Sequence, residues 1–597
     1  MNKRGSRAVG IDLGTTYSSL AYLDAQFVPC VMSDTSGHSV IPSAIYFDEQ
    51  SIIVGDTALE LAKQNGSRAV QFVKLHMGDD WRFTVDGHVH SPESLSAIIL
   101  AHLIREAEPQ IGAVQDAVIT VPAWFTEKRR RATEQAGRIA GLNVTGTLNE
   151  PMAAALAYGL HKAEDSKTGK PAAEKNVLVY DLGGGTFDVT LMRIAPTELV
   201  ELATRGNRKL GGKDWDESLM KLVLEDFRRS KHAANRSALQ AADRFSECLA
   251  NEAALPQLPA ELLNAFFDLR LECERAKRRL SSTTKTAIPL RFTGLNHSAE
   301  IARSQFEAAT DALVQSTRMT VETALDDAKL TWDRLDRIVL VGGSTHMPMV
   351  RQMLQQASGK PPDRGINPVT AVSLGAAIYA HQLETGRGPL TVPLNKGEVG
   401  SDPARTNPAV SVNAGASPSP QVQFVTAHGI GIRTASATKS VNNVLIHRNT
   451  SVPTTVSRRF RTKSDRVGPT SGIRVVVTQG DTPDASLAEI LGTARITGIP
   501  PNDLPGQPVD ITLAFDAQSR IHLHALYVNT GQSLALDLDV PGGLREEQVE
   551  QYRHLLVSSG LIHPAPPPPM LDQEIFSLDE GFLNDEDEDE PLLEPID

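Results

Sequence analysis

Two patterns of apolar and polar residues divide the chain into an earlier and a later part. Between Arg7 and Leu383, short apolar runs end in glycine-rich turns and alternate with helical segments, as in RAVGIDLGTT and DRIVLVGGST. Continuous apolar runs of this length are typical of strands buried on both faces of an α/β sheet. The spacing also predicts an alanine-rich helix over 150–160 and a helix with a basic face over 269–280. We therefore expect an α/β domain over 7–383.

The pattern changes after this domain. Residues 384–421 are rich in Pro, Gly, Asn and Ser without periodicity, which predicts a flexible linker. Over 422–541 apolar residues recur at every second position, as in VDITLAF (509–515), which predicts an antiparallel β-sandwich. A short helix over 544–556 follows. The proline-rich, acidic composition of 557–597 predicts a disordered tail.

The charge of the chain is concentrated in that tail. The chain has 597 residues and a net charge of −13, and its length exceeds what one hydrophobic core supports. Residues 571–597 carry twelve acidic residues and no Lys or Arg, so the remainder is close to neutral. Without a broad basic field, a nucleic-acid partner is not expected.

The three cysteines indicate a reducing compartment. Cys30, Cys248 and Cys273 are odd in number and far apart, so they form neither a disulfide framework nor a CxxC metal motif. No apolar run reaches membrane-spanning length, and the basic start lacks the apolar core of a signal peptide. We expect a cytoplasmic protein without a membrane partner.

The run VYDLGGGTFD (179–188) places three glycines between Asp181 and Asp188. Such glycines suit either a tight hairpin turn or a backbone cradle for a phosphate. The run VGIDLGTTYS (9–18) repeats the plan of strand, Asp, Leu, Gly and Thr, and GGST (342–345) forms a third turn after a buried strand. The repeat predicts a duplicated fold with two lobes facing one cleft, and it favours the phosphate cradle.

Metal chemistry fits the same turns. Each of the two repeated turns brings one aspartate, Asp12 or Asp181. Because Mg²⁺ dehydrates reluctantly, the two aspartates would hold the ion through waters. Neither a Walker A motif nor a G-x-G-x-x-G after a strand occurs, so neither a P-loop nor a Rossmann site is expected.

Several long motifs resemble the heat-shock protein 70 family, the DnaK-type chaperones, within the actin-like ATPase superfamily. They are GIDLGTTYS, AVITVPAWF, AGLNVTGTLNEPMAAALAYGL, VYDLGGGTFDVTLM, CERAKRRLSS, VLVGGSTHMPMV and INPVTAVSLGAA, in the order of the family. The resemblance covers Arg7 to Leu383 nearly throughout. In the β domain it is weaker, where HRNTSVPTTVSRRF, VVVTQG and GIPP are similar to the peptide-binding module. It implies a two-lobed actin-like ATPase domain before that module.

The resemblance also implies roles for individual residues. The catalytic group would be Lys74, Glu150, Asp181, Thr186 and Asp188. The nucleotide and its Mg²⁺ would be held by Asp12, Gly14, Thr15, Thr16, Tyr17, Gly183, Gly184, Gly185, Gly212, Glu274, Lys277, Arg278, Ser281, Gly342, Gly343 and Ser344. Pro122 and Arg130 match a relay that reports the state of the nucleotide to the linker.

The function that the resemblance implies is an ATP-dependent chaperone. It would hydrolyse ATP to ADP slowly with Mg²⁺, and K⁺ is a further cation that the resemblance admits. Its partners would be unfolded or client polypeptides, a J-domain cochaperone and a nucleotide-exchange factor. Two alternatives remain, a nucleotide-sensing scaffold with little coupled turnover and a small-molecule kinase of the actin-like superfamily.

The chain departs from the family at four places that bear on function. Arg208 stands where the family has a threonine, which puts a cation near the expected phosphate site. Val369 replaces an aspartate after INP. The linker is long and poor in leucine, which weakens coupling between domains. The helical lid is reduced to one helix, so bound peptide should exchange quickly.

The basic run SRRFRTKSDR (457–466) has several interpretations. It could contact RNA or an acidic partner, or its charges could protect a solvated strand edge from pairing. The acidic tail could dock a basic partner, fold back onto this run, or serve solubility.

Overall fold

The computed structural model describes residues 7–162, 174–195, 198–292, 294–385, 421–435, 440–462, 472–497, 506–516, 520–538, 543–563 and 593–595. Most of the expected linker (386–420) and of the expected tail (564–592) lies outside these described residues. The chain forms two compact units. The first unit comprises 1–125, 132–423 and 544–562, and the second comprises 126–131, 424–543 and 563–597.

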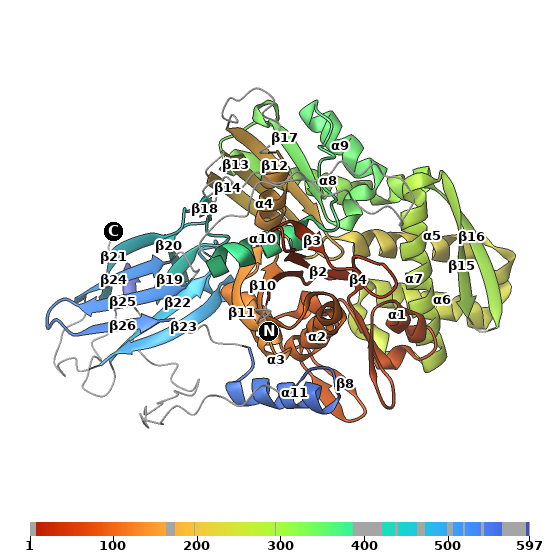
Figure 1. Cartoon of the computed structure of the whole chain (residues 1–597), viewed down its shortest axis with the longest axis horizontal. Helices are drawn as coiled ribbons and strands as arrows, with labels where there is room; N and C mark the ends of the chain where they lie inside the picture. Colours follow the sequence, from red (N-terminus) through yellow and green to blue (C-terminus); the bar gives the residue numbers. More distant parts are fainter. Residues whose placement is uncertain are drawn as a thin grey trace. The chain divides into compact units, whose positions relative to one another are not determined.

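The first unit contains two mixed sheets built on one plan (Figure 1). One has the order β11 (Asn143–Asn149), β10 (Val114–Val121), β1 (Arg7–Asp12), β2 (Tyr17–Leu23) and β3 (Pro29–Val31), and β4 (Ile41–Pro42) also pairs with β2. The other has the order β17 (Arg337–Val341), β12 (Lys175–Leu182), β13 (Phe187–Ile194), β14 (Glu198–Asn207) and β18 (Gln421–Gln423). β1 runs parallel to β10 and antiparallel to β2, and β12 runs likewise beside β17 and β13. The duplicated fold predicted from the two DLG turns is thus confirmed.

Helices cover these sheets at very close range. α10 (Ala371–Thr385) packs against β1 and against α4 (Glu150–Lys162). A Cβ at Gly10 would overlap the backbone of Ala377, and one at Gly375 would overlap the carbonyl of Ala153. Only glycine therefore allows this strand and these two helices to approach one another so closely. The packing fixes the two DLG turns relative to the helices behind them.

The remaining elements complete the first unit. A large core gathers Trp215, Phe227, Phe266 and Phe306 from the long helices around the second sheet. The helices are α1 (Asp56–Ala62), α2 (Pro92–Ile111), α3 (Glu127–Ile139), α5 (Gly212–Arg229), α6 (Arg236–Ala250), α7 (Ala260–Ser282), α8 (Arg303–Asp327) and α9 (Pro348–Ser358). The strands are β5 (Ala44–Phe47), β6 (Ile52–Val54), β7 (Ala69–Gln71), β8 (Phe83–Val85), β9 (His88–His90), β15 (Lys285–Phe292) and β16 (Leu295–Ala302). The helices predicted over 150–160 and 269–280 correspond to α4 and to the second half of α7.

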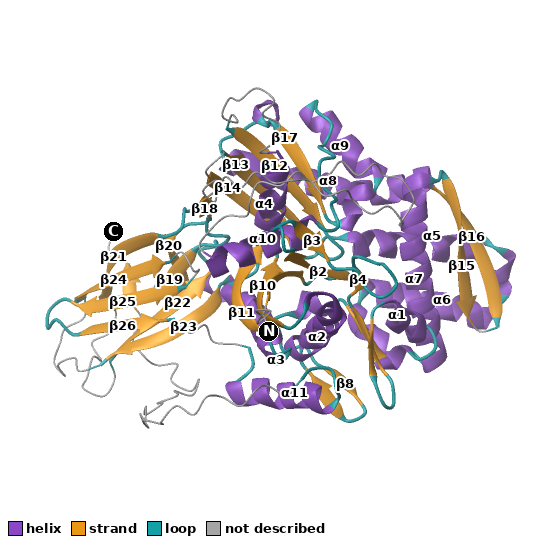
Figure 2. Cartoon of the chain, in the orientation of Figure 1, coloured by secondary structure: helices purple, strands orange, loops and turns teal. Residues whose placement is uncertain are grey.

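α11 (Glu546–Ser558) belongs to the first unit, although it follows the β domain in sequence. Its apolar face joins the buried cluster of the first sheet through Val549 and Leu556. Just before the helix, the Gln135 side chain donates a hydrogen bond to the Leu544 carbonyl at 2.7 Å and accepts one from its N–H at 2.9 Å. Tyr552 donates to the Val89 carbonyl at 3.1 Å, which holds α11 beside the β8–β9 hairpin (Figure 2). The helix is an integral part of the first unit.

The second unit consists of two antiparallel sheets around one buried cluster. The first sheet has the order β20 (Ser440–Ile446), β19 (Ile430–Ala435), β22 (Ile473–Gln479) and β23 (Glu489–Ile496). The second has the order β26 (Ser533–Asp537), β25 (Ile521–Tyr527), β24 (Pro508–Phe515), β21 (Thr454–Thr462) and β27 (Leu593–Pro595). Along β24, Val509, Ile511, Leu513 and Phe515 are buried and alternate with less buried residues, as period two predicts.

Two segments differ from the sequence-based expectation. Gln421–Gln423 does not open the β domain, because it pairs in parallel with β14 of the first unit. Leu593–Pro595, in the part of the tail expected to be disordered, forms a strand on β21. Both segments form backbone hydrogen bonds with the edge strand of a sheet. The local amino-acid composition does not predict such pairing. Among the described residues, no helix is long and apolar enough to cross a membrane, and all three cysteines are free.

Candidate functional site

A cavity of about 670 Å³ lies in the first unit where the glycine turns meet. The turns after β1, β12 and β17 all line it, together with residues of α7. Strand ends with glycine turns place backbone N–H groups at the wall of a cavity, where they can meet an anion. The three turns singled out in the sequence therefore converge on one site.

A buried acidic cluster with one lysine forms the floor of the cavity. Lys74 and Glu150 form an ion pair, with side chains only 5% and 10% exposed. Beside them, Thr120 Oγ1 donates a hydrogen bond of 3.4 Å to Asp12 Oδ1. Burial, and then the charge of Glu150, raises the pKa of Asp12 from 3.8 to about 7. The lysine thus neutralises only part of the negative charge gathered here.

Asp181 and Asp188 belong to the same cluster and face each other across β12 and β13. Burial and the neighbouring Glu150 raise the pKa of both carboxyl groups well above the usual range. Asp188 Oδ1 is buried without a hydrogen-bond partner in the described structure. A site with this excess of buried acid is suited to a bound cation.

The glycine turns touch one another so closely that side chains are excluded. A Cβ at Gly184 would overlap the hydroxyl of Thr16, and one at Gly211 would overlap the backbone of Gly185. The contact is fixed by hydrogen bonds from Gly212 N to the Gly183 carbonyl at 2.9 Å and from Lys213 N to the Gly184 carbonyl at 2.7 Å. Steric exclusion therefore explains the missing side chains at two positions of the GGG run, Gly184 and Gly185.

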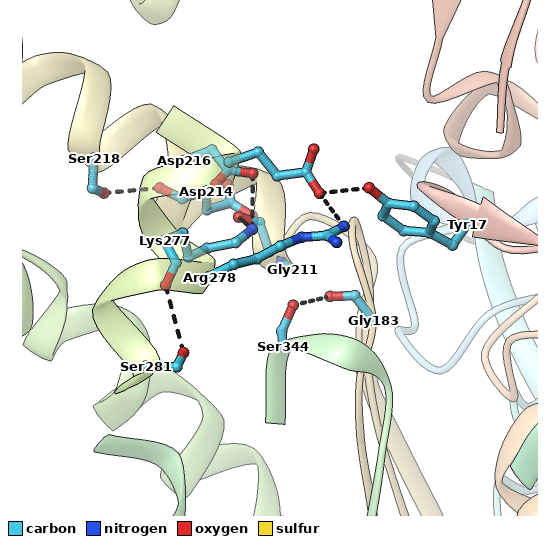
Figure 3. Close-up of polar contacts among 12 residues, drawn as sticks. Tyr17, Gly183, Gly211, Asp214, Asp216, Ser218, Lys277, Arg278, Ser281 and Ser344 are labelled. Atoms are coloured by element: carbon cyan, nitrogen blue, oxygen red, sulfur yellow. Dashed lines mark hydrogen bonds and ion pairs between the residues drawn. The ribbon is translucent and has the colours of Figure 1, made fainter. Parts of the chain in front are cut away.

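A polar network on α7 forms another wall of the cavity (Figure 3). Glu274 Oε1 accepts hydrogen bonds from Tyr17 at 2.9 Å and from Arg278 at 2.7 Å. The Arg278 guanidinium also lies over the Tyr17 ring, 4.8 Å from its centre. Tyr17 is far in sequence from Glu274 and Arg278, which lie four residues apart on α7. Their contacts orient the arginine at the cavity.

Lys277 joins α7 to the start of α5. Its Nζ donates to Asp216 Oδ2 at 2.8 Å and to the Gly212 carbonyl at 2.9 Å. Burial raises the pKa of Asp216 to about 7, and Lys277 opposes this shift. On the other side, Ser344 Oγ donates to the Gly183 carbonyl at 2.9 Å, which ties the third glycine turn to the second (Figure 3).

Most of the residues singled out in the sequence line this cavity. The lining includes Asp12, Gly14, Thr15, Thr16, Tyr17, Lys74, Glu150, Asp181, Gly183, Gly184, Thr186, Glu274, Lys277, Arg278, Ser281, Gly342, Gly343 and Ser344. Gly185, Asp188 and Gly212 are not among the lining residues. These three residues contact residues that line the cavity.

Sequence reasoning missed several residues of the cavity. They are Val40, Asp216, Ser282, Val341, His346, Met347, Pro368 and Val372. For Asp216 a signal was present, because it follows Gly212 by four residues and so lies on the same face of the helix. Of the two single-residue departures from the family, Val369 lines the cavity, whereas Arg208 is exposed just beyond β14 and does not line it.

The residues present fit a hydrated magnesium ion. Among the residues that the structure describes, no group of three or more His, Cys, Asp or Glu side chains is placed to ligate a metal directly. Mg²⁺ commonly keeps several of its waters and needs only one or two carboxylates. Asp12 and Asp181 at the cavity wall provide those carboxylates.

The chain matches known proteins over most of its length. A model of the family described as Hsp70 protein matches residues 8–255, 261–390 and 412–586. The protein named Chaperone protein DnaK in Thermotoga neapolitana is 34% identical over 560 residues, which cover 92% of this chain and 83% of that protein. The proteins of that name in Thermotoga petrophila and Thermosipho africanus show the same identity and coverage.

Proposed function

Because the chain belongs to the Hsp70 family of ATP-dependent molecular chaperones, we propose that its ATPase site is the cavity of the first unit. The chain is an ATPase and a chaperone by membership of that family. What supports this location is the convergence of the three glycine turns on a cavity that also holds a buried lysine and a cluster of carboxylates. We further propose that ATP turnover here controls polypeptide binding by the second unit.

The proposed reaction is the transfer of the terminal phosphoryl group of ATP to water, which gives ADP and phosphate. This reaction depends on positioning and on neutralising charge more than on covalent help. Thr15, Thr16, Gly183 and Gly184 would hold phosphate oxygens by their N–H and hydroxyl groups. Lys74 would neutralise charge on the terminal phosphate, and its ion pair with Glu150 holds it in place.

The carboxylates have two proposed roles. Asp12 and Asp181 would bind the waters of Mg²⁺, and the ion, when bound, neutralises charge on the phosphates. Thr186, Asp188 and Glu150 would orient the attacking water. The raised pKa of Asp188, together with its unpartnered oxygen, supports a role in accepting a hydrogen bond or proton from that water.

The nucleoside would bind at the α7 wall. Glu274, Lys277, Arg278 and Ser281 lie there, opposite the turn Gly342–Ser344. The planar guanidinium of Arg278, already oriented by Glu274 and Tyr17, offers a surface on which a base can stack. We also propose J-domain cochaperones and nucleotide-exchange factors as partners, on the ground of family membership.

The test is single-turnover ATP hydrolysis by the full chain, with and without a permanently unfolded polypeptide. A working chaperone cycle predicts hydrolysis that the polypeptide accelerates and that Asp181→Asn abolishes. Tight ATP binding with turnover that the polypeptide does not change would favour a nucleotide-sensing scaffold. The exposed position of Arg208, outside the cavity lining, removes one reason for preferring that scaffold.

A further inference from the structure

The C-terminal end of the chain adds a strand to the second unit. In β27, Leu593, Glu594 and Pro595 lie opposite Thr462, Arg461 and Phe460 of β21 in antiparallel register. On its other side β21 pairs with β24. The tail thus completes an edge of the sheet that would otherwise expose its backbone groups.

The added strand also fills a gap between the two sheets. β27 pairs with β21 in one sheet and packs against β19 and β22 of the other. Leu593 is only 1% exposed and belongs to the same buried cluster as Ile432, Phe460 and Ile473. Burial of this apolar side chain away from water favours the attachment. This leucine is the anchor of the segment.

Charge favours the same attachment. β21 carries three exposed arginines, Arg458, Arg459 and Arg461, and Arg459 forms an ion pair with Asp510 at 2.6 Å. The segment that reaches β21 follows the run DEDEDE (585–590) and contains Glu594 and Asp597. Opposite charges across paired strands stabilise the pairing. Of the interpretations of the basic run and the acidic tail, the fold-back of one onto the other accords with this register.

We propose that the chain's own C-terminus, anchored by Leu593, occupies the edge of β21 and competes there with the polypeptides that the second unit binds. The proposal rests on the proposed function in one respect, that the second unit binds polypeptides. Strand addition uses main-chain hydrogen bonds for affinity and side-chain pockets for specificity. A three-residue strand with one anchor binds weakly, but its tether keeps it near the site.

The experiment compares the full chain with its Leu593→Ser variant by fluorescence anisotropy. The probes are a labelled, permanently unfolded polypeptide and a labelled decapeptide, EDEPLLEPID, with the sequence of residues 588–597. The matched control is Leu536→Ser, which alters an exposed leucine of the same unit. Because a competitor on the same chain acts at an effective concentration of roughly millimolar, we expect both probes to bind Leu593→Ser about tenfold tighter than wild type or control.

A substituted decapeptide and a conservative variant of the chain test whether the leucine side chain is the anchor. A decapeptide in which serine replaces the residue equivalent to Leu593 should bind no variant. Leu593→Met, which keeps an apolar anchor, should behave as wild type. If Leu593→Ser does not fold, judged by circular dichroism, Leu593→Ala takes its place with the same expectation.

The outcomes separate this proposal from the proposed function. Equal binding of the unfolded polypeptide by wild type and Leu593→Ser would overturn competition by the tail and leave the chaperone assignment intact. Failure of the decapeptide to bind Leu593→Ser would overturn the proposed occupancy of the β21 edge by the C-terminus. Failure of the unfolded polypeptide to bind any variant would overturn polypeptide binding by the second unit, and ATP hydrolysis, measured separately, would then decide the first unit's role.

Discussion

Lys74 and Glu150 form an almost fully buried ion pair, and the charge of Lys74 also opposes the raised pKa of the neighbouring Asp12 and Asp181 carboxyl groups. Buried charges are retained at a cost, and a buried pair is weak support for stability by itself. The pair lines the cavity together with Asp12 and Asp181, and this position indicates a role in binding an anion and a cation there.

Loss of Lys74 should affect both hydrolysis and folding. Lys74→Ala leaves the charge of Glu150 buried without its partner, which should lower the free energy of unfolding by about 3–5 kcal/mol. Loss of a preorganised charge at the phosphate should slow single-turnover hydrolysis by roughly 10²–10³-fold. The control is Lys285→Ala, which breaks an exposed pair with Glu300 at 3.1 Å and should change little. A wild-type rate for Lys74→Ala would exclude its catalytic role.

The raised pKa of Asp12 predicts a pH dependence of stability. In the folded chain this pKa is about 7, against an ordinary value of 3.8, so the folded state binds the proton more tightly than the unfolded state does. The stabilisation that protonated Asp12 contributes is therefore fully present below the ordinary value of 3.8 and is lost as pH rises through about 7. In Mg²⁺-free buffer, wild type should lose thermal stability between pH 5 and pH 8 relative to Asp12→Asn. Parallel pH profiles for the two proteins would contradict the prediction, and Mg²⁺ with ADP should reduce the difference.

The close contact of the two glycine turns should make Gly184 intolerant of any side chain. The Cβ of Gly184→Ala would overlap the Thr16 hydroxyl, so the turns must separate. Overpacking of this kind costs about 1–3 kcal/mol, and we expect ATP affinity to fall by about tenfold or more in equilibrium binding. Gly159→Ala, where the nearest atom lies at 4.0 Å, is the control that should bind ATP normally. Equal affinities for the two variants would argue against the cradle.

The two single-residue departures from the family, Arg208 and Val369, should differ in their effect on the ATPase. Arg208 is exposed and outside the cavity, so Arg208→Thr should leave the hydrolysis rate within about twofold of wild type. Val369 lines the cavity, so Val369→Asp adds a carboxylate to its wall and should change nucleotide affinity. Titration with ATP and with ADP measures both effects. A larger effect of Arg208→Thr than of Val369→Asp would reverse this assignment.

The packing of α11 predicts that it stabilises the first unit. Leu556→Ala removes a side chain that is 2% exposed, and the first unit should lose about 2–5 kcal/mol of stability. Glu547→Ala, on the exposed side of the same helix, should have little effect. Hydrogen exchange across 132–139 of α3 would report the loss locally. Unchanged exchange in Leu556→Ala would contradict the packing.

The sequence predicted those parts of the molecule whose signals are local. The turns at Asp12 and Asp181 were found because a strand, an aspartate and glycines stand next to one another, and the observed cavity contains both. The helix α4 followed from its alanine content. The repeat of one turn was enough to predict the duplicated sheets, because a repeated motif carries information about a distant part of the chain.

Contacts between distant segments could not be predicted in this way. The acidic composition around Leu593 predicts disorder and leaves fold-back onto the basic run as one of three interpretations, whereas in the structure Leu593 pairs with Thr462 and its side chain is buried. Similarly, nothing near Gln135 indicates that its side chain bonds the backbone of Leu544. Such pairs depend on which surfaces meet after folding, and periodicity describes only one element at a time.

The return of the chain to its first unit has a consequence for how the protein can be divided. Both β18 and α11 lie after the region 386–420, yet they complete a sheet and a buried cluster formed by residues before it. A single cut in that region would therefore yield two polypeptides that remain associated without a covalent link. Conversely, a fragment ending at residue 385 would expose the surface that Val549 and Leu556 cover, and it would be prone to aggregate. The working ATPase unit should be recoverable by mixing the two pieces, as in a split protein.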